Sequence, residues 1–166
     1  MDKKTIELAR EHGIEMAEGR ISRVVPLRLR PGTDVLLGLT EAAKLAGIKN
    51  GVILSAIGSL NGAKYCDPVE LPTKAGYGYG EVLHLTGPIE LLNAAGIICH
   101  DDQDEINLHI HVTLGDRHGG THGGHLVEGT KVLITVDVVM AEIEGMVMGR
   151  KWSEELEVPL FSPRQE

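Results

Sequence analysis

Aromatic residues are scarce in this chain. They make up 3% of its 166 residues: one Trp, one Phe and three Tyr. Because rings are so few, we expect Val, Ile, Leu and Ala to fill most of the core. A single domain of this length can bury roughly 70% of the surface that its unfolded chain exposes. The simplest prediction is therefore one globular domain.

Cysteine is nearly absent as well. Cys66 and Cys99 lie far apart in the sequence and form no CxxC pair. Closely spaced cysteines mark thiol-redox and cysteine-zinc sites, and stable disulfides belong to oxidising compartments. We therefore expect two reduced, structural cysteines in a cytoplasmic protein.

Long apolar runs are also missing. The segment Met1–Glu7 contains no apolar core of a signal peptide. No stretch approaches the roughly 18 consecutive apolar residues of a membrane span. The sequence predicts a soluble, cytoplasmic protein with no membrane partner.

Positive charge is in deficit. The chain has 24 Asp and Glu against 16 Lys and Arg, which gives a formal net charge of −8. DNA binding depends strongly on Lys and Arg side chains that neutralise phosphates. The overall charge therefore argues against direct DNA binding, although a local basic patch remains compatible with it.

Glycine, by contrast, is abundant. The 21 glycines predict many turns and close backbone approaches rather than long helices. Residues 1–19 have apolar side chains at roughly helical spacing and predict a short, charged helical extension. From Arg20 the period changes to two, which indicates a strand ending at Pro31-Gly32.

A β-α-β unit opens the main part of the chain. Thr33 or Asp34 can cap a helix that ends at Gly47 or at Asn50-Gly51, and a nearly continuous apolar strand follows at 51–60. The remaining elements expected from the pattern are strands at 81–86, 106–114 and 131–140 and a final edge segment at 158–161.

Two segments have the composition of ligand loops without the necessary context. Gly76, Gly78 and Gly80 precede a strand, whereas a dinucleotide-binding fingerprint lies between a strand and a helix. The acidic segment 101–105 lacks the glycine and the distal glutamate of an EF-hand loop. We expect neither nucleotide nor calcium binding, and interpret 101–105 as a solvated connector.

The segment 106–114 alternates without a break between apolar and polar residues. Side chains two residues apart on a strand point to the same face. One face is therefore an apolar stripe for the core, and His109 and His111 project together from the other. Taken alone, the pair could also be two exposed surface histidines.

A glycine-rich reversal at 119–124 follows and ends at His125. We expect this reversal to bring His125 beside His109 and His111. Three neutral imidazoles form a donor set for zinc or another divalent transition metal. Because three ligands leave a fourth tetrahedral position open, such a set is typical of catalytic rather than structural zinc.

Several spaced motifs occur in an order that resembles the plant and prokaryote conserved (PPC) domain family. Between residues 25 and 142 they are Arg28–Val35, Ser55–Leu60, Gly80–Gly87, His109-Ile110-His111 and Gly123–Leu126. The resemblance implies an α/β (α+β) fold with an antiparallel-rich mixed sheet flanked by helices, assembled as a homotrimer. We accordingly place an N-terminal helical extension at 1–19, the PPC domain at 20–161 and a C-terminal tail at 162–166.

The resemblance also bears on function. In plants the domain is joined to AT-hooks, Arg-Gly-Arg-Pro segments that enter the minor groove, and this tetrapeptide does not occur in the sequence. Prokaryotic members resemble a wider structural group that includes acetolactate decarboxylase, in which histidines hold zinc. Carried over by motif, His109, His111 and His125 are the matching ligands, in agreement with the strand pattern.

Four further residues near these motifs have alternative interpretations. His118 and His122 lie in the same loop and rank second as ligands. His84 is expected to be a core or interface histidine. Glu81 is the candidate catalytic carboxylate, as a general acid or base or as a partner of a ligand, and the alternative is an exposed glutamate at the start of a strand.

Two hypotheses about function follow. In the first, the protein is a metal-centred enzyme or small-ligand-binding protein that acts on a carbonyl or carboxylate compound by Lewis-acid polarisation, as a lyase or hydrolase would. In the second, it is a DNA-associated regulatory or scaffolding module without catalytic activity. No sequence feature identifies a reaction.

Overall fold

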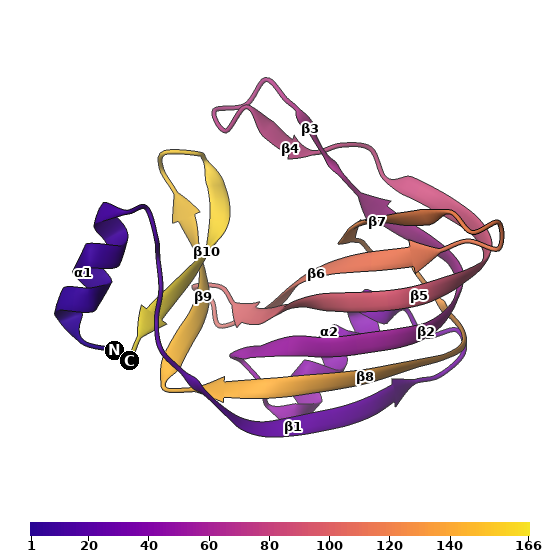
Figure 1. Ribbon diagram of the computed structural model, residues 1–166, viewed down its shortest axis with the longest axis horizontal. Helices are drawn as coiled ribbons and strands as arrows, with labels where there is room; N and C mark the ends of the chain where they lie inside the picture. The colour runs from indigo at the N-terminus through magenta and orange to yellow at the C-terminus, as the bar shows by residue number, and fades with distance from the viewer.

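The computed structural model describes residues 1–166 and contains two helices and ten strands (Figure 1). Neither helix is long and apolar enough to cross a membrane. The elements in chain order are α1 (Lys3–Glu11), β1 (Arg20–Leu29), α2 (Val35–Ala46), β2 (Gly51–Cys66), β3 (Pro68–Glu70), β4 (Tyr77–Tyr79), β5 (Leu83–His100), β6 (Ile106–Gly115), β7 (Thr121–Leu126), β8 (Val132–Glu144), β9 (Met146–Ser153) and β10 (Val158–Gln165).

Eight strands form one sheet in the order β1-β8-β2-β7-β6-β5-β9-β10, and β3 and β4 form a separate hairpin. Because β2 also pairs with β5, the strands β2, β7, β6 and β5 close a ring. All pairings are antiparallel except one parallel bridge between β5 and β9. The predicted antiparallel-rich mixed sheet is confirmed.

The predicted β-α-β opening is also present. β1 and β2 both run antiparallel to β8, which lies between them, and α2 connects the two. The Asp34 side chain caps α2 by accepting a hydrogen bond from the Leu37 backbone N–H at 3.2 Å. Gly47 ends the helix in the left-handed conformation, with φ 68°.

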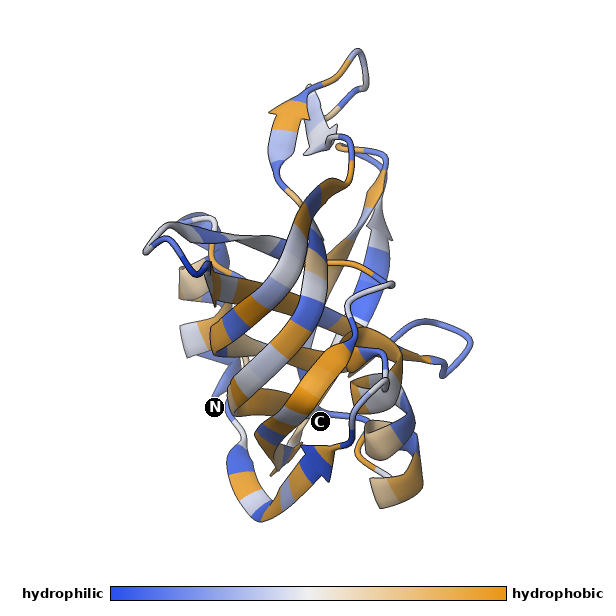
Figure 2. Cartoon of the chain, turned by 90° about the vertical axis from the view of Figure 1, so that its right-hand side faces the viewer, coloured by the Kyte–Doolittle hydropathy of each residue, from blue (hydrophilic) through white to orange (hydrophobic).

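The main core lies between α2 and one face of the sheet. It consists of 22 buried residues, nearly all aliphatic, and Tyr65 is its one aromatic member. Val35, Leu39 and Ala43 come from α2, whereas β6 contributes Ile110 among others. Figure 2 shows apolar and polar residues alternating along the strands, as expected for strands with one buried face.

The two cysteines are free and buried, as predicted. Cys66 ends β2, and Cys99 belongs to a small second cluster with Met146 and Met148 near β9. Ile97 packs against this second cluster, and its partner on the neighbouring strand is His109. The face of the sheet opposite α2 is therefore covered at one end by β9 and its neighbours.

The C-terminal residues continue the sheet rather than forming a tail. The pairing of β10 with β9 runs through Gln165 opposite Met146, so the boundary predicted at 161/162 falls inside a strand. The Gln165 side chain also accepts from the Glu18 backbone N–H at 3.1 Å and donates to the Glu18 carbonyl at 3.2 Å. These bonds attach the N-terminal segment to β10, and α1 lies at that end of the molecule, away from the sheet faces (Figure 1).

Candidate metal centre

Strand β6 places two imidazoles side by side on the sheet face opposite the core. Ile110 and Val112 are buried, while the alternate residues His109 and His111 point the other way. Their Nε2 atoms are 3.0 Å apart and their ring centroids 5.0 Å apart. The shared orientation predicted from the alternation is confirmed.

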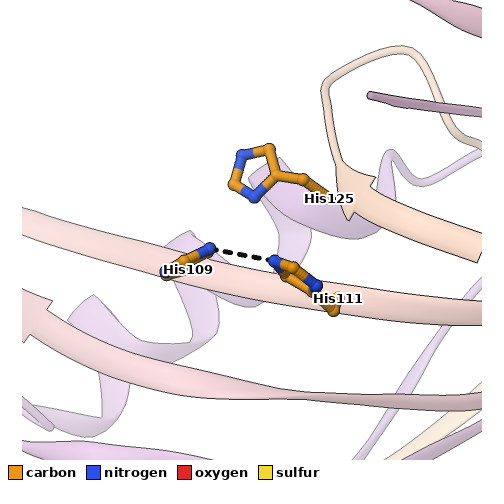
Figure 3. Close-up of side chains that lie close together, drawn as sticks. All are labelled: His109, His111 and His125. Atoms are coloured by element: carbon orange, nitrogen blue, oxygen red, sulfur yellow. Dashed lines mark hydrogen bonds between the residues drawn. The ribbon is translucent and has the colours of Figure 1, made fainter. Parts of the chain in front are cut away.

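Strand β7 supplies the third imidazole. It pairs antiparallel with β6 and sets His125 directly opposite His111. The His125 ring centroid lies 5.0 Å from that of His109 and 5.7 Å from that of His111. Each of the three residues offers a ligand nitrogen within 4.8 Å of the others, and Figure 3 shows the rings gathered from the two strands. The sequence prediction that these three residues converge is therefore confirmed.

The glycines before His125 act differently from the expectation. The reversal is centred near Gly119, with φ 84°, whereas Gly123 and Gly124 belong to β7 itself. A Cβ at Gly124 would lie 2.7 Å from the Cys66 carbonyl oxygen, and one at Gly123 would collide with the carbonyl of Val112. The two glycines thus allow β7 to fit between β2 and β6, and this close packing positions His125.

A tyrosine that the sequence analysis missed covers the three histidines. The Tyr79 hydroxyl lies 3.2 Å from Nε2 of His109 and 3.5 Å from Nε2 of His111, and its ring stacks on His125 at 4.3 Å. Tyr79 ends the β3–β4 hairpin, in a region that the sequence analysis treated as a glycine series. The available signal was the concentration of Tyr77 and Tyr79 in a chain with so few rings.

The environment keeps two of the imidazoles neutral. Burial, and then the charges of His109, His111 and Arg150, lower the pKa of His125 to about 4. Burial, His111 and Arg150 also lower the pKa of His109. Neutral imidazole is the form that binds a metal. The Nδ1 atom of His125 is buried without a hydrogen-bond partner, so the donor set fits a divalent transition metal.

These lowered pKa values predict that the metal-free protein loses stability in acid. The unfolded chain takes up a proton at His125 near pH 6.5, whereas the folded chain does so only near pH 4. The stability that the folded protein gains from a neutral His125 is therefore complete above pH 6.5 and is lost as the pH falls from 6.5 to 4. Allowing for partial solvent exposure, we expect a loss of about 1–2 kcal/mol.

Urea denaturation of chelator-treated protein between pH 7 and pH 4 measures this loss. A His125→Gln variant is the control, because it cannot titrate and its stability should fall less over this range. Equal pH dependence of the two proteins would contradict the prediction.

His118 and His122 lie outside the cluster. His122 Nε2 is 2.8 Å from a carboxylate oxygen of Asp116, and Arg117 Nε donates to His118 Nε2 at 3.1 Å. The bond from His122, followed by the backbone N–H groups of Gly120 and His118, lowers the pKa of Asp116 to about 2. These contacts stabilise the connection between β6 and β7, and neither histidine is brought to the other three.

Glu81 and His84 also lie outside the cluster. Glu81 is exposed in the bend between β4 and β5, and its catalytic role stays a prediction. His84 is exposed on β5 opposite Lys64. It is not a core residue, because the first residues of β5 extend beyond the core and only Leu85 among residues 83–88 is partly buried.

Comparison with known sequences identifies the family. The model of the Plants and Prokaryotes Conserved domain, abbreviated PCC or PPC, matches residues 16–144. The chain belongs to this family. A PPC protein of Pyrococcus horikoshii is 28% identical, with a TM-score of 0.74 over 89% of this chain and 97% of that one. The fold and the family expected from the spaced motifs are therefore confirmed.

Two other kinds of relative are informative. A metal-containing protein of Archaeoglobus fulgidus is 26% identical to the present chain, with a TM-score of 0.75 over 89% of this chain and 99% of that one. A bifunctional protein GlmU of a Synechococcus strain is 33% identical over 121 residues. The match covers 72% of this chain but 17% of that GlmU, so the likeness concerns one segment of a much longer protein.

Proposed function

We propose that this PPC protein binds a divalent transition metal, zinc in our prediction, through His109, His111 and His125, and presents it to a small carbonyl or carboxylate ligand. The observation that carries the proposal is the convergence of three ligand nitrogens within 4.8 Å. Three-histidine donor sets are typical of catalytic zinc. The metal content of the Archaeoglobus fulgidus relative supports the same interpretation.

The metal would supply Lewis acidity to a ligand carbonyl or carboxylate oxygen. Tyr79 is the residue placed to assist, because its hydroxyl already lies against His109 and His111. Burial raises the pKa of Tyr79, so its hydroxyl stays protonated at neutral pH and can donate a hydrogen bond to a ligand. We propose a lyase or hydrolase as the reaction class, with Glu81 as the candidate acid or base.

We also propose that the protein assembles as a homotrimer through the sheet face opposite α2. Pro26 and Ser55 both lie opposite Val139, so the three side chains form one row across β1, β8 and β2. Val24 precedes Pro26 by two residues and Ile57 follows Ser55 by two, so both side chains lie on this face. They are 55% and 52% exposed. Exposed apolar side chains that share one face of a sheet in this way are typical of surfaces covered by another subunit.

Metal analysis of the purified protein, together with light scattering, tests these proposals. We expect about one metal ion per chain and a mass about three times the 17.9 kDa of one chain. Protein that takes up no zinc after incubation with it would contradict the metal site, and a monomeric mass would contradict the trimer. The net charge of −8 disfavours DNA, and micromolar DNA binding that weakens steeply with added salt would support the alternative function.

A further inference from the structure

One positive charge beside the histidines has no negative partner. Arg150 lies on β9, partly buried, and takes part in none of the chain's ion pairs. Its Nη1 donates to Asn107 Oδ1 at 2.8 Å and its Nη2 to the Pro159 carbonyl at 3.2 Å. Both acceptors are neutral, although acidic residues outnumber basic ones in this chain.

The same guanidinium has an unused donor. The Nε atom of Arg150 is buried and has no hydrogen-bond partner. A buried donor without an acceptor is costly, and more so when it belongs to a charged group. An anion bound next to the Arg150 guanidinium would supply the negative charge and the hydrogen-bond acceptors that the chain itself does not provide.

Asn107 holds this charge close to the histidine cluster. Asn107, His109 and His111 alternate along β6 and share one face. Side chains two residues apart on a strand are separated by about 7 Å, so the guanidinium bound to Asn107 lies beside the row of imidazoles. The contribution of Arg150 to the lowered pKa values of both His109 and His125, after burial and the neighbouring imidazoles, agrees with this placement.

We propose that Arg150 is the anion-recognition residue of the histidine site and selects ligands that carry a carboxylate. The proposal rests on the proposed function, because it names the ligand class of the same site. A guanidinium binds a carboxylate through charge-assisted hydrogen bonds. A small acid with a second oxygen function could contact Arg150 at one end and the histidine-held metal at the other.

The surroundings favour a small ligand. Tyr79 and Arg150 come from two different hairpins, β3–β4 and β9–β10, which border the histidine strand (Figure 1). The hairpins also touch at their ends, where Lys74 Nζ donates to the Glu154 carbonyl at 2.6 Å and lies 3.4 Å from a carboxylate oxygen of Glu157. The histidine strand is thus bordered on two sides by hairpins that touch each other, and such surroundings suit a small acid better than a macromolecule.

Pyruvate and pyruvamide form a matched pair of probes, because they have the same size and differ in charge. Calorimetry on the zinc-incubated full chain should show pyruvate binding more tightly than pyruvamide. The Arg150→Gln variant should lose about 10- to 100-fold in pyruvate affinity, the amount that a hydrogen bond to a charged group contributes. Lys151→Gln, which removes a charge from the exposed neighbouring residue, should leave pyruvate affinity unchanged.

A second readout does not depend on the variant folding. The Nε–H resonance of Arg150 in wild-type protein should shift when pyruvate is added and stay in place with pyruvamide. Metal-loaded protein that binds both probes equally, with this resonance unmoved, would overturn the role of Arg150 and leave the metal site standing. Protein that takes up no zinc but still shows the pyruvate-specific shift would overturn the proposed function and support Arg150.

Discussion

His111→Ala is expected to lower the zinc affinity of the protein by about 100- to 1,000-fold. Four-ligand zinc sites in small proteins bind with about 10–16 kcal/mol, so each ligand accounts for about 2.5–4 kcal/mol. His111 is exposed, and its Nε2 lies 3.0 Å from that of His109. Its removal should therefore weaken the metal site without destabilising the fold. Competition titration against a chromophoric chelator measures the change.

His122→Ala is the matched control for this prediction. His122 lies on β7, as His125 does, but three residues away and bonded to Asp116. The sequence pattern allowed it as a substitute ligand, whereas the structure leaves it outside the cluster. The zinc affinity of the His122→Ala variant should equal that of the wild-type protein. A loss as large as that of His111→Ala would mean that the ligand set is assigned wrongly.

Gly124→Ala should destabilise the protein by about 2–3 kcal/mol, the upper part of the range for overpacking in a close-packed interior. The added methyl group would lie 2.7 Å from the Cys66 carbonyl oxygen and 2.8 Å from the Tyr65 ring. The backbone of β7 must move away from β2 to accommodate it. Because His125 is the next residue, zinc affinity should fall in the same variant. Thermal unfolding should show a decrease in Tm of about 5–10 °C.

Gly115→Ala provides the comparison for a strand glycine with space around it. A methyl group there would meet only the Leu92 side chain, at 3.4 Å or more. Since alanine restricts the unfolded chain more than glycine does, stability should stay the same or rise slightly. If both variants lost stability equally, the close approach of β7 to β2 would not be the reason for glycine at position 124.

The strand that carries the site was predictable from local pattern. Apolar residues at every second position of 106–114 determine which face is buried, so His109 and His111 had to share the opposite face. The cap at Asp34 and the helix end at Gly47 were predictable in the same way, because capping depends on residues within one turn. Such features depend only on residues a few positions apart, so they can be predicted from the sequence without knowledge of the tertiary structure.

The complete site required contacts between distant parts of the chain. Tyr79 contacts His109 from the β3–β4 hairpin, which precedes β6, and Arg150 contacts Asn107 of β6 from the β9–β10 hairpin, which follows β8. No periodicity relates them to β6, because their positions depend on how β3–β4 and β9–β10 pack against the sheet. The glycines of β7 were recognised, but their role was misjudged, since a close backbone approach to β2 is visible only once the strands are paired. Short-range alternation was thus sufficient to place His109 and His111 on one face, whereas the positions of Tyr79 and Arg150 were specified by long-range packing.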